Sequence, residues 1–341
     1  MSQGYQIKQL PEDFIVREMP ALRLVDKGAY VVFELRKKNY TTERAVQQIA
    51  DALHLDRKRI GYAGAKDSKA ITEQSISIKG VGQARVEGLK LRDVELKFLG
   101  CSDNPISLGD LEGNSFEVVV RNISKKPKKI GRIINYFGEQ RFSKNNAEIG
   151  KAIIKKDFKK AVDRIIDSIG KEEEKVIEHL KKNKNDFVGA LKAMPWKTLN
   201  MYIHAYQSKL WNETAKKLLE LKKDSPTLNS GAIKSKTKKD NIKNIKLPLI
   251  GFATEVQDKA ISKIVERILQ NEDVKKEDFV IRAIPELSSA GSERELFVEV
   301  KELKIGKLEY DELNPGKKKV KINFSLGKGS YATEVMKELF S

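Results

Sequence analysis

The chain has 341 residues, of which 40% are hydrophobic, enough to bury the core of one large domain or two ordinary ones. Its 66 basic and 48 acidic residues give a net charge of +18, which favours a polyanionic partner such as nucleic acid, although a lysine-rich thermophilic proteome would produce the same balance. The composition excludes a disordered tail, the single Cys101 excludes a disulfide framework, and the absence of any run of about 18 apolar residues excludes a membrane-spanning helix.

Strand composition or alternation of apolar and polar residues marks much of the first 121 residues. One helix is expected among these strands, from about Thr42 to Leu53, with an apolar face and a threonine able to cap its start. The predicted strands are Phe14–Glu18, Ala29–Arg36, Gln74–Lys79, Arg92–Leu99 and Ser115–Arg121. This pattern predicts helices packed on a sheet.

Helical patterns dominate from about residue 145 to residue 286. They are clearest at 201–221 and 261–269, and the polar stretch 222–246 between them carries many lysines. Alternation returns after Arg294, at 296–300 and 320–324, before a closing helix that begins near Ser330. Strands, then helices, then strands again predict a helix-rich domain inserted into a sheet-based one.

The stretch GYAGAKDSKAITEQ, residues 61–74, sets Asp67 between Lys66 and Lys69 in a glycine-containing turn. The two lysines favour the ionised carboxylate, and the glycines at 61 and 64 allow a tight bend and the close approach of a ligand. Asp67 is therefore a candidate nucleophile. From local chemistry alone, an aspartate that caps the next element or bonds its own turn is the more common case.

Five blocks of sequence resemble, in order, the TruD family of tRNA pseudouridine synthases, in its archaeal-like members. The spacing Gly64-x-Lys66-Asp67-x-x-Ala70-x-Thr72-x-Gln74 fills every position of that family's signature. The other blocks are KQLPEDF at 8–14, GDLEGNSFEVVVR at 109–121, NYFGEQRF at 135–142 and GSYATEVMKEL at 329–339. One departure is Ser143, where the family usually has a glycine after the NYFG block.

The resemblance implies an α+β pseudouridine synthase catalytic fold with a mixed, largely antiparallel sheet, interrupted by a helix-rich TRUD insertion domain. We expect the catalytic domain at 1–155 and 290–341 and the insertion at 156–289. In the family, the aspartate at the position of Asp67 is catalytic, and a basic residue at the position of Lys8 pairs with it. Without the resemblance, Lys8 would be an ordinary surface lysine.

The resemblance also places the phenylalanine of the NYFG block, Phe137, against the target uracil, with Asn135 nearby. A uridine that leaves its stack needs a flat apolar partner and a polar reader. The ordinary alternatives are a core phenylalanine and an asparagine that caps a turn. Arg141 in the same block could contact phosphate or brace a carboxylate.

No metal or organic cofactor is expected. The three histidines and one cysteine do not suggest a zinc site, and the glycine-rich loops that cradle nucleotide phosphates are absent from the sequence. Pseudouridine formation is an isomerisation and needs neither. We expect a cytoplasmic monomer with a tRNA substrate, without a membrane or small-molecule cofactor partner.

Three lysine clusters could follow an RNA backbone, although each alone is more typical of a solvated face. They are Lys125, Lys126, Lys128 and Lys129; Lys155, Lys156, Lys159 and Lys160; and Lys234, Lys236, Lys238 and Lys239. The block HAYQSKLWN at 204–212 groups Tyr206, Leu210 and Trp211, which at helical spacing ordinarily form core.

These observations favour an RNA-modifying isomerase that converts uridine to pseudouridine during tRNA processing, at tRNA position 13 as is typical of the family. The alternatives are a synthase that acts at another tRNA or RNA site, an RNA-binding protein of the same fold without turnover, and a glycosidase that releases free base.

Overall fold

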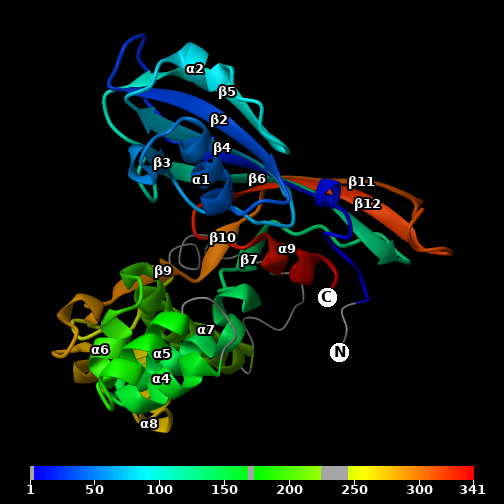
Figure 1. Ribbon diagram of the computed structural model, residues 1–341. Coiled ribbons are helices and arrows are strands. Elements are labelled where there is room, and N and C mark those ends of the chain that lie inside the picture. Colours follow the sequence, from blue (N-terminus) through cyan, green and yellow to red (C-terminus); the bar gives the residue numbers. More distant parts are fainter. Residues whose placement is uncertain (1–3, 168–172, 224–244) are drawn as a thin grey trace. The chain divides into compact units, whose positions relative to one another are not determined.

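The computed structural model describes residues 4–167, 173–223 and 245–341. Contacts divide the chain into unit 1, Met1–Ile133 with Val298–Ser341, and unit 2, Ile134–Phe297 (Figure 1). The predicted insertion, 156–289, lies within unit 2. The unit extends beyond the predicted insertion on both sides, in part because helix α3 (Asn146–Ile154) packs against helix α7 (Trp196–Lys223).

In the described part of unit 1, eight strands form one mixed sheet in the order β11-β12-β6-β1-β4-β2-β5, with β3 paired to β4. β1 and β4 are parallel, and the other pairs in this sheet are antiparallel. The strands are β1 (Phe14–Pro20), β2 (Tyr30–Lys38), β3 (Ile60–Tyr62), β4 (Ile71–Lys79), β5 (Val94–Ser102), β6 (Leu111–Ile123), β11 (Lys301–Tyr310) and β12 (Lys318–Gly327). The five strands predicted before residue 122 are all present.

The helices of unit 1 begin where the sequence offers a cap or a change of pattern. Helix α1 (Thr42–Ala52) is capped by Thr41, whose hydroxyl accepts a hydrogen bond from the Arg44 backbone. The closing helix α9 (Ala332–Leu339) follows the last strand, as predicted. The shorter elements are η1 (Pro11–Asp13), η2 (Arg57–Arg59) and α2 (Gln83–Glu87).

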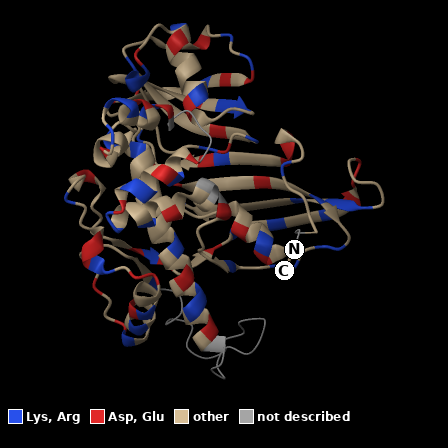
Figure 2. Cartoon of the chain, turned by 60° about the horizontal axis from the view of Figure 1, so that its bottom comes forward, with Lys and Arg blue, Asp and Glu red and all other residues tan. Residues whose placement is uncertain are grey.

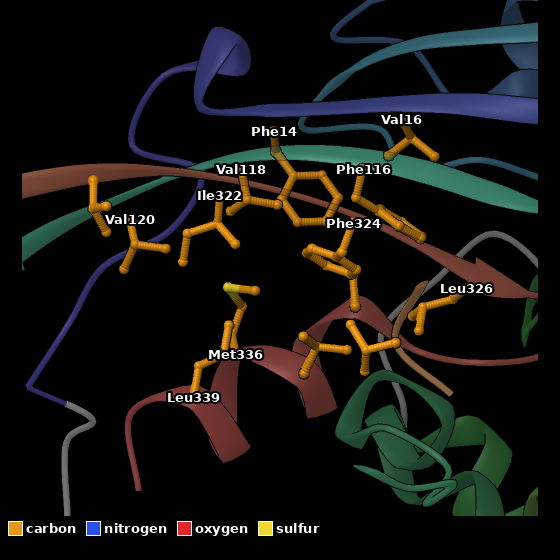
Figure 3. Close-up of a cluster of buried hydrophobic side chains, with 14 of the residues drawn as sticks. Phe14, Val16, Phe116, Val118, Val120, Ile322, Phe324, Leu326, Met336 and Leu339 are labelled. Carbon is orange, nitrogen blue, oxygen red and sulfur yellow. The ribbon is translucent and has the colours of Figure 1, made fainter. Parts of the chain in front are cut away.

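One face of the sheet carries two apolar clusters. α9 covers the first, and Figure 3 shows Met336 and Leu339 of that helix facing Phe14, Phe116 and other side chains of β1, β6 and β12. α1 covers the second, which includes side chains of β2 and β4. Because successive strand residues point to opposite faces, the register Val16↔Thr72 sets both clusters on the same side of the sheet.

The opposite face carries a ladder of alternating charges across six strands. Neighbouring members form ion pairs with N–O distances between 2.8 and 3.9 Å. In order across the sheet they are Lys321, Glu117, Arg17, Glu73, Arg36 and Glu95. Since the charges of the ladder cancel, these six side chains give an RNA backbone no electrostatic advantage.

Unit 2 is mostly helical and is built around α7. Tyr206, Leu210 and Trp211 of this helix are fully buried, which confirms the core interpretation of their spacing. Figure 2 shows basic and acidic residues interleaved over the helices. The remaining elements are η3 (Glu139–Asn145), α4 (Phe158–Ile166), α5 (Glu173–Lys182), α6 (Phe187–Lys192), α8 (Lys259–Asn271), η4 (Lys276–Phe279), η5 (Pro285–Leu287), β8 (Lys246–Leu249) and β9 (Ser292–Glu295).

The chain passes from one unit to the other twice, and a short strand lies at each passage. β7 (Arg132–Ile134) pairs with β10 (Phe297–Glu299). Beside them, the Val300 N–H donates to the Gly131 carbonyl at 3.0 Å. None of the helices in the described segments combines the length and the apolar character that a bilayer span requires.

Candidate active site

A buried polar patch separates the two apolar clusters on the helix-covered face of unit 1. It consists of Lys37 on β2 and of Thr72 and Gln74 on β4, each at most 1% exposed. The register pairs Lys37 with Thr72 and Leu35 with Gln74, so all of these side chains share one face. Buried polar groups are costly unless they are hydrogen-bonded. Lys37 and Gln74 satisfy this requirement by holding the segment that carries Asp67.

The segment around Asp67 is fixed by three hydrogen bonds from this region. Lys37 Nζ donates to the Asp67 carbonyl at 2.9 Å, and Gln74 Nε2 donates to the Gly64 carbonyl at 3.0 Å. The Lys66 N–H donates to Thr42 Oγ1 at 2.9 Å, and the Thr42 hydroxyl donates in turn to Gln74. Two positions of the signature, Gly64 and Gln74, therefore contact each other and hold the turn, together with Thr42 at the start of α1.

The Asp67 carboxylate forms an ion pair with Lys8, at 3.1 Å between Oδ2 and Nζ. The two side chains are 29% and 21% exposed, so the pair is reachable from solvent. Lys8 Nζ also lies 4.1 Å from the centre of the Phe14 ring. The structure thus brings together the two residues that the sequence assigned to catalysis.

The two lysines that flank Asp67 in sequence have different surroundings. Lys66 forms an ion pair with Glu18 at 2.5 Å, and the two side chains are only 6% and 1% exposed. Lys69 is exposed. The Lys66 side chain therefore extends to β1. Lys8, which is 59 positions away in sequence, is the lysine that contacts the carboxylate.

The two glycines near Asp67 have different surroundings. Neither Gly61 nor Gly64 has a positive φ. A Cβ on Gly61 would lie 2.3 Å from the Ile106 carbonyl oxygen, so Gly61 is needed for close packing on β3. A Cβ on Gly64 would have nothing nearer than Lys66 Nζ at 3.9 Å.

Lys8 adopts the left-handed backbone conformation, with φ of 62°, which is uncommon outside glycine. The segment is held on both sides. Gln6 exchanges two backbone hydrogen bonds with Arg121, at 2.8 and 2.9 Å, and the Leu10 N–H donates to Asp13 at 2.9 Å. Backbone strain of this kind persists where surrounding contacts fix it, and it is frequent at functional sites.

A buried ion-pair network anchors this segment. Arg121 Nη2 lies 2.9 Å from Asp13, and Nη1 lies 3.0 Å from Asp311. Burial alone would raise the pKa of Asp311, but hydrogen bonds from the Asn122 backbone and other donors lower it to about 2. Two of the sequence blocks, 8–14 and 109–121, therefore meet through Asp13 and Arg121. Neither residue was among those predicted from the sequence to form the site.

Asn135 and Phe137 belong to unit 2 and have partners there. The Asn135 side chain accepts a hydrogen bond from Arg294 at 2.6 Å and donates to the Glu295 carbonyl at 3.2 Å. Asn212 holds the Phe137 backbone through two hydrogen bonds of 2.9 Å, one to the N–H and one to the carbonyl. Both residues are fixed in place, and both are nearly buried, at 8% and 9% exposed.

The ring of Phe137 has two close neighbours. The Arg294 guanidinium carbon lies 4.0 Å from the ring centre, and the Trp211 ring meets it edge-on at 5.7 Å. The Arg141 guanidinium carbon is farther, at 5.9 Å. Asn212 and Arg294 were not singled out from the sequence. Asn212 is the last residue of the block HAYQSKLWN, and its place in that block is the sequence feature that could have pointed to it.

The second lysine cluster is partly engaged in unit 2. Lys155 pairs with Asp273 at 3.0 Å and Lys156 with Asp278 at 3.2 Å, whereas Lys159 and Lys160 are exposed. In the first cluster, Lys128 pairs with Glu338 at 3.1 Å. The third cluster, Lys234 to Lys239, lies outside the described residues.

The chemistry available at Asp67 is that of a carboxylate held by an ammonium. Within the described segments, no group of three His, Cys, Asp or Glu side chains is arranged to hold a metal ion. A solvent-reachable, ion-paired carboxylate can act as a nucleophile or as a base toward a bound substrate.

Comparison with solved structures identifies the class of protein to which the fold belongs. The fold matches that of a crystal structure described as the "Putative tRNA pseudouridine synthase D (TruD)" from Methanosarcina mazei, with a TM-score of 0.73 and 30% sequence identity. The match covers all of this chain and 94% of the other. The α+β class predicted from the sequence is confirmed.

The chain belongs to the tRNA pseudouridine synthase D (TruD) family, whose model matches residues 2–178 and 170–339. It is 31% identical to a protein of Methanosarcina acetivorans named "Probable tRNA pseudouridine synthase D", over 98% of this chain and 92% of that protein. It is 30% identical to the tRNA pseudouridine synthase D of Aquifex aeolicus, over 98% of both chains. The resemblance seen in the five sequence blocks is therefore confirmed.

Proposed function

We propose that this protein is a tRNA pseudouridine synthase, an isomerase that converts uridine to pseudouridine in tRNA, with Asp67 as its catalytic carboxylate. Family membership supports the reaction. The observation that carries the assignment of the residue is the 3.1 Å contact between Asp67 and Lys8, which belong to two separate blocks of the family resemblance.

The reaction breaks the bond from uracil N1 to ribose C1′, turns the base while it stays bound, and joins C5 to C1′. The C5 proton is lost at the end, and N1 gains one, so the overall change is an isomerisation. Asp67 either attacks C1′ or assists removal of the C2′ proton. Either role needs a carboxylate held in place, and the Lys8 ammonium at 3.1 Å orients it.

Phe137 is proposed to stack on the uracil after it leaves the RNA helix, with Asn135 beside it. The support is the NYFG block and the rigid attachment of Phe137 to Asn212. Because Arg294 covers one face of the ring, the base would use the other face or displace the guanidinium.

The proposal also covers the target position, the oligomeric state, the cellular location and the role of the insertion. We expect position 13 of tRNA as the target, a monomeric enzyme, and a cytoplasmic setting. We also expect the insertion, 156–289, to contribute phosphate contacts, since the segment around Asp67 is too short to grip a folded RNA.

The test is to incubate the purified protein with individual unmodified tRNA transcripts and to map pseudouridine by site. Conversion at one uridine supports the proposal, and the mapped position identifies which nucleotide of the tRNA is modified. Tight binding with no conversion on any transcript would favour an RNA-binding protein of the same fold. Release of free uracil would favour a glycosidase.

A further inference from the structure

Lys37 occupies a position where a charged side chain is unexpected. It lies on β2, in the inward-facing series Phe33, Leu35, Lys37, and its exposure is 1%. Lysine is almost never fully buried unless its ammonium has specific partners. Lys38, its neighbour on the same strand, points to the other side and is exposed at 42%, where it pairs with Glu12. The strand thus offers one buried and one exposed lysine in adjacent positions.

Two main-chain carbonyl oxygens accept hydrogen bonds from the Lys37 ammonium. The distances are 2.5 Å to Tyr40 and 2.9 Å to Asp67. The first acceptor lies at the end of β2, just before α1, and the second is the backbone of Asp67 itself. The ammonium therefore ties the segment that carries Asp67 to the rigid centre of the sheet.

The charges around Lys37 also couple its ammonium to Asp67. Burial lowers the pKa of Lys37 to about 8, while the negative charge of Asp67 opposes the shift and the positive charge of Lys66 adds to it. Both hydrogen-bond acceptors are carbonyl groups without net charge, so the Asp67 carboxylate is the negative charge that favours the ammonium. Lys66 does not have the same role as Lys37, because the Lys66 ammonium is paired with Glu18.

We infer that Lys37 is a positioning residue for Asp67. Its buried ammonium fixes the main chain of Asp67, so that the carboxylate stays directed at Lys8 and at the sugar of the target nucleotide. The inference rests on the proposed function, because it assumes that Asp67 carries the chemistry. It adds a residue that acts from beneath the turn, through the backbone, and that does not touch the substrate.

The first test compares Lys37→Met with the matched control Lys38→Met, which removes one lysine from the same strand but not from the buried patch. Single-turnover rate, RNA affinity and melting temperature are measured on the same preparations. We expect Lys37→Met to turn over about 10- to 100-fold more slowly, as a small misplacement of a catalytic group would cause. RNA affinity should stay within about twofold, since no substrate contact is lost.

The melting temperature separates positioning from folding. Lys37→Met loses two hydrogen bonds but no longer buries a charge, so the two effects oppose each other and we expect a shift of less than about 5 °C. Lys38→Met should retain the wild-type rate. A Lys37→Met protein that turns over within twofold of wild type would overturn the inference, and so would an equal loss in Lys38→Met.

A second variant covers the case in which Lys37→Met does not fold. Lys37→Cys, alkylated with 2-bromoethylamine in denaturant and then refolded, regains an ammonium of nearly the same length. Wild-type protein carried through the same treatment controls for alkylation of Cys101. Recovery of rate in the alkylated variant, from a folded but slow Lys37→Cys, supports the inference. A folded alkylated variant that stays slow, or a Lys37→Cys that folds only after alkylation, contradicts it.

Wild type and Asp67→Asn are run beside these variants so that the two hypotheses remain separable. If wild type converts no transcript, the proposed function is wrong. If wild type is active and Asp67→Asn is as active as wild type, the role of Asp67 is wrong and the Lys37 inference falls with it. If wild type is active, Asp67→Asn is not, and Lys37→Met is as fast as wild type, only the Lys37 inference fails.

Discussion

Glu18 and Lys66 form a buried ion pair inside unit 1, with both side chains at most 6% exposed. Lys66 directly precedes Asp67 in sequence, yet its charge is directed to β1 and away from the carboxylate. Lys8 therefore makes the ion-pair contact with Asp67 at 3.1 Å. The stability of the turn and the orientation of the Asp67 carboxylate thus depend on different lysines, which makes them separable by mutation.

Asp67→Asn should abolish turnover and spare RNA binding, because the amide keeps the shape of the side chain but cannot act as the nucleophile. We expect the single-turnover rate to fall by more than about 10³-fold. The control is Asp51→Asn, on the exposed side of α1. Conversion by Asp67→Asn near the wild-type rate would remove Asp67 from the mechanism.

Lys8→Met should slow turnover about 10- to 100-fold, because the carboxylate loses the cation that orients it. The rate is measured under single-turnover conditions. An unchanged rate would show that the ion pair has no part in the chemistry.

Glu18→Gln should destabilise the fold by about 3 to 5 kcal/mol, because it leaves the Lys66 ammonium buried without its carboxylate. Replacing both residues with methionine removes the uncompensated charge, so the double variant should recover much of that loss. Urea unfolding followed by circular dichroism measures both. Equal losses in the single and double variants would argue against the ion pair as the origin of the effect.

Phe137→Leu should separate stacking from packing better than alanine does. Leucine fills much of the space beside Trp211, so the stability cost should stay below about 1.5 kcal/mol. It offers no aromatic face, and stacking on a base is worth about 1 to 3 kcal/mol, so turnover at subsaturating RNA should fall by about one to two powers of ten. Phe137→Tyr should retain most activity. A leucine variant that is folded and fully active would exclude the stacking role and show that Phe137 is a core residue.

The α3–α4 lysines should divide into two classes. Lys159 and Lys160 are exposed, so replacing both with glutamine should flatten the plot of log affinity against log salt if they meet phosphates, by about 0.7 to 0.9 per contact. Replacing Lys155 and Lys156, which pair with Asp273 and Asp278, should leave the slope unchanged and cost about 1 kcal/mol or less for each pair. Equal slopes in wild type and the Lys159/Lys160 variant would show that these lysines are solvated and do not contact phosphates. The same measurement tests Lys234, Lys236, Lys238 and Lys239.

Local patterns were sufficient to predict the main elements of the fold. The alternation of Val94, Leu96 and Phe98 predicted β5, and the apolar face from Ala45 to Leu53 predicted α1. The short strands β3 and β7 were not predicted, because three residues carry too little periodicity to stand out, whereas the alternation at 296–300 marked β10. Their existence depends on partners that are distant in sequence.

The site was only partly predictable, for a similar reason. The family resemblance pointed to Asp67 and Lys8, but spacing along the chain alone does not say which lysine reaches the carboxylate. Lys37 left a readable signal, since it interrupts the inward-facing series after Phe33 and Leu35. Arg121 and Asp13 left none of this kind, because their pairing joins residues 108 positions apart.

The hydrogen bond between Val300 and Gly131 bears on how such a protein could gain or lose a segment during evolution. Since these two residues of unit 1 are already in contact at 3.0 Å, everything between them leaves and re-enters the sheet-based unit at one point. Insertions and deletions in that excursion can change its length greatly without altering the register of β6, β11 or β12. A lineage can thus remodel the helical part while the strands around Asp67 keep their pairing.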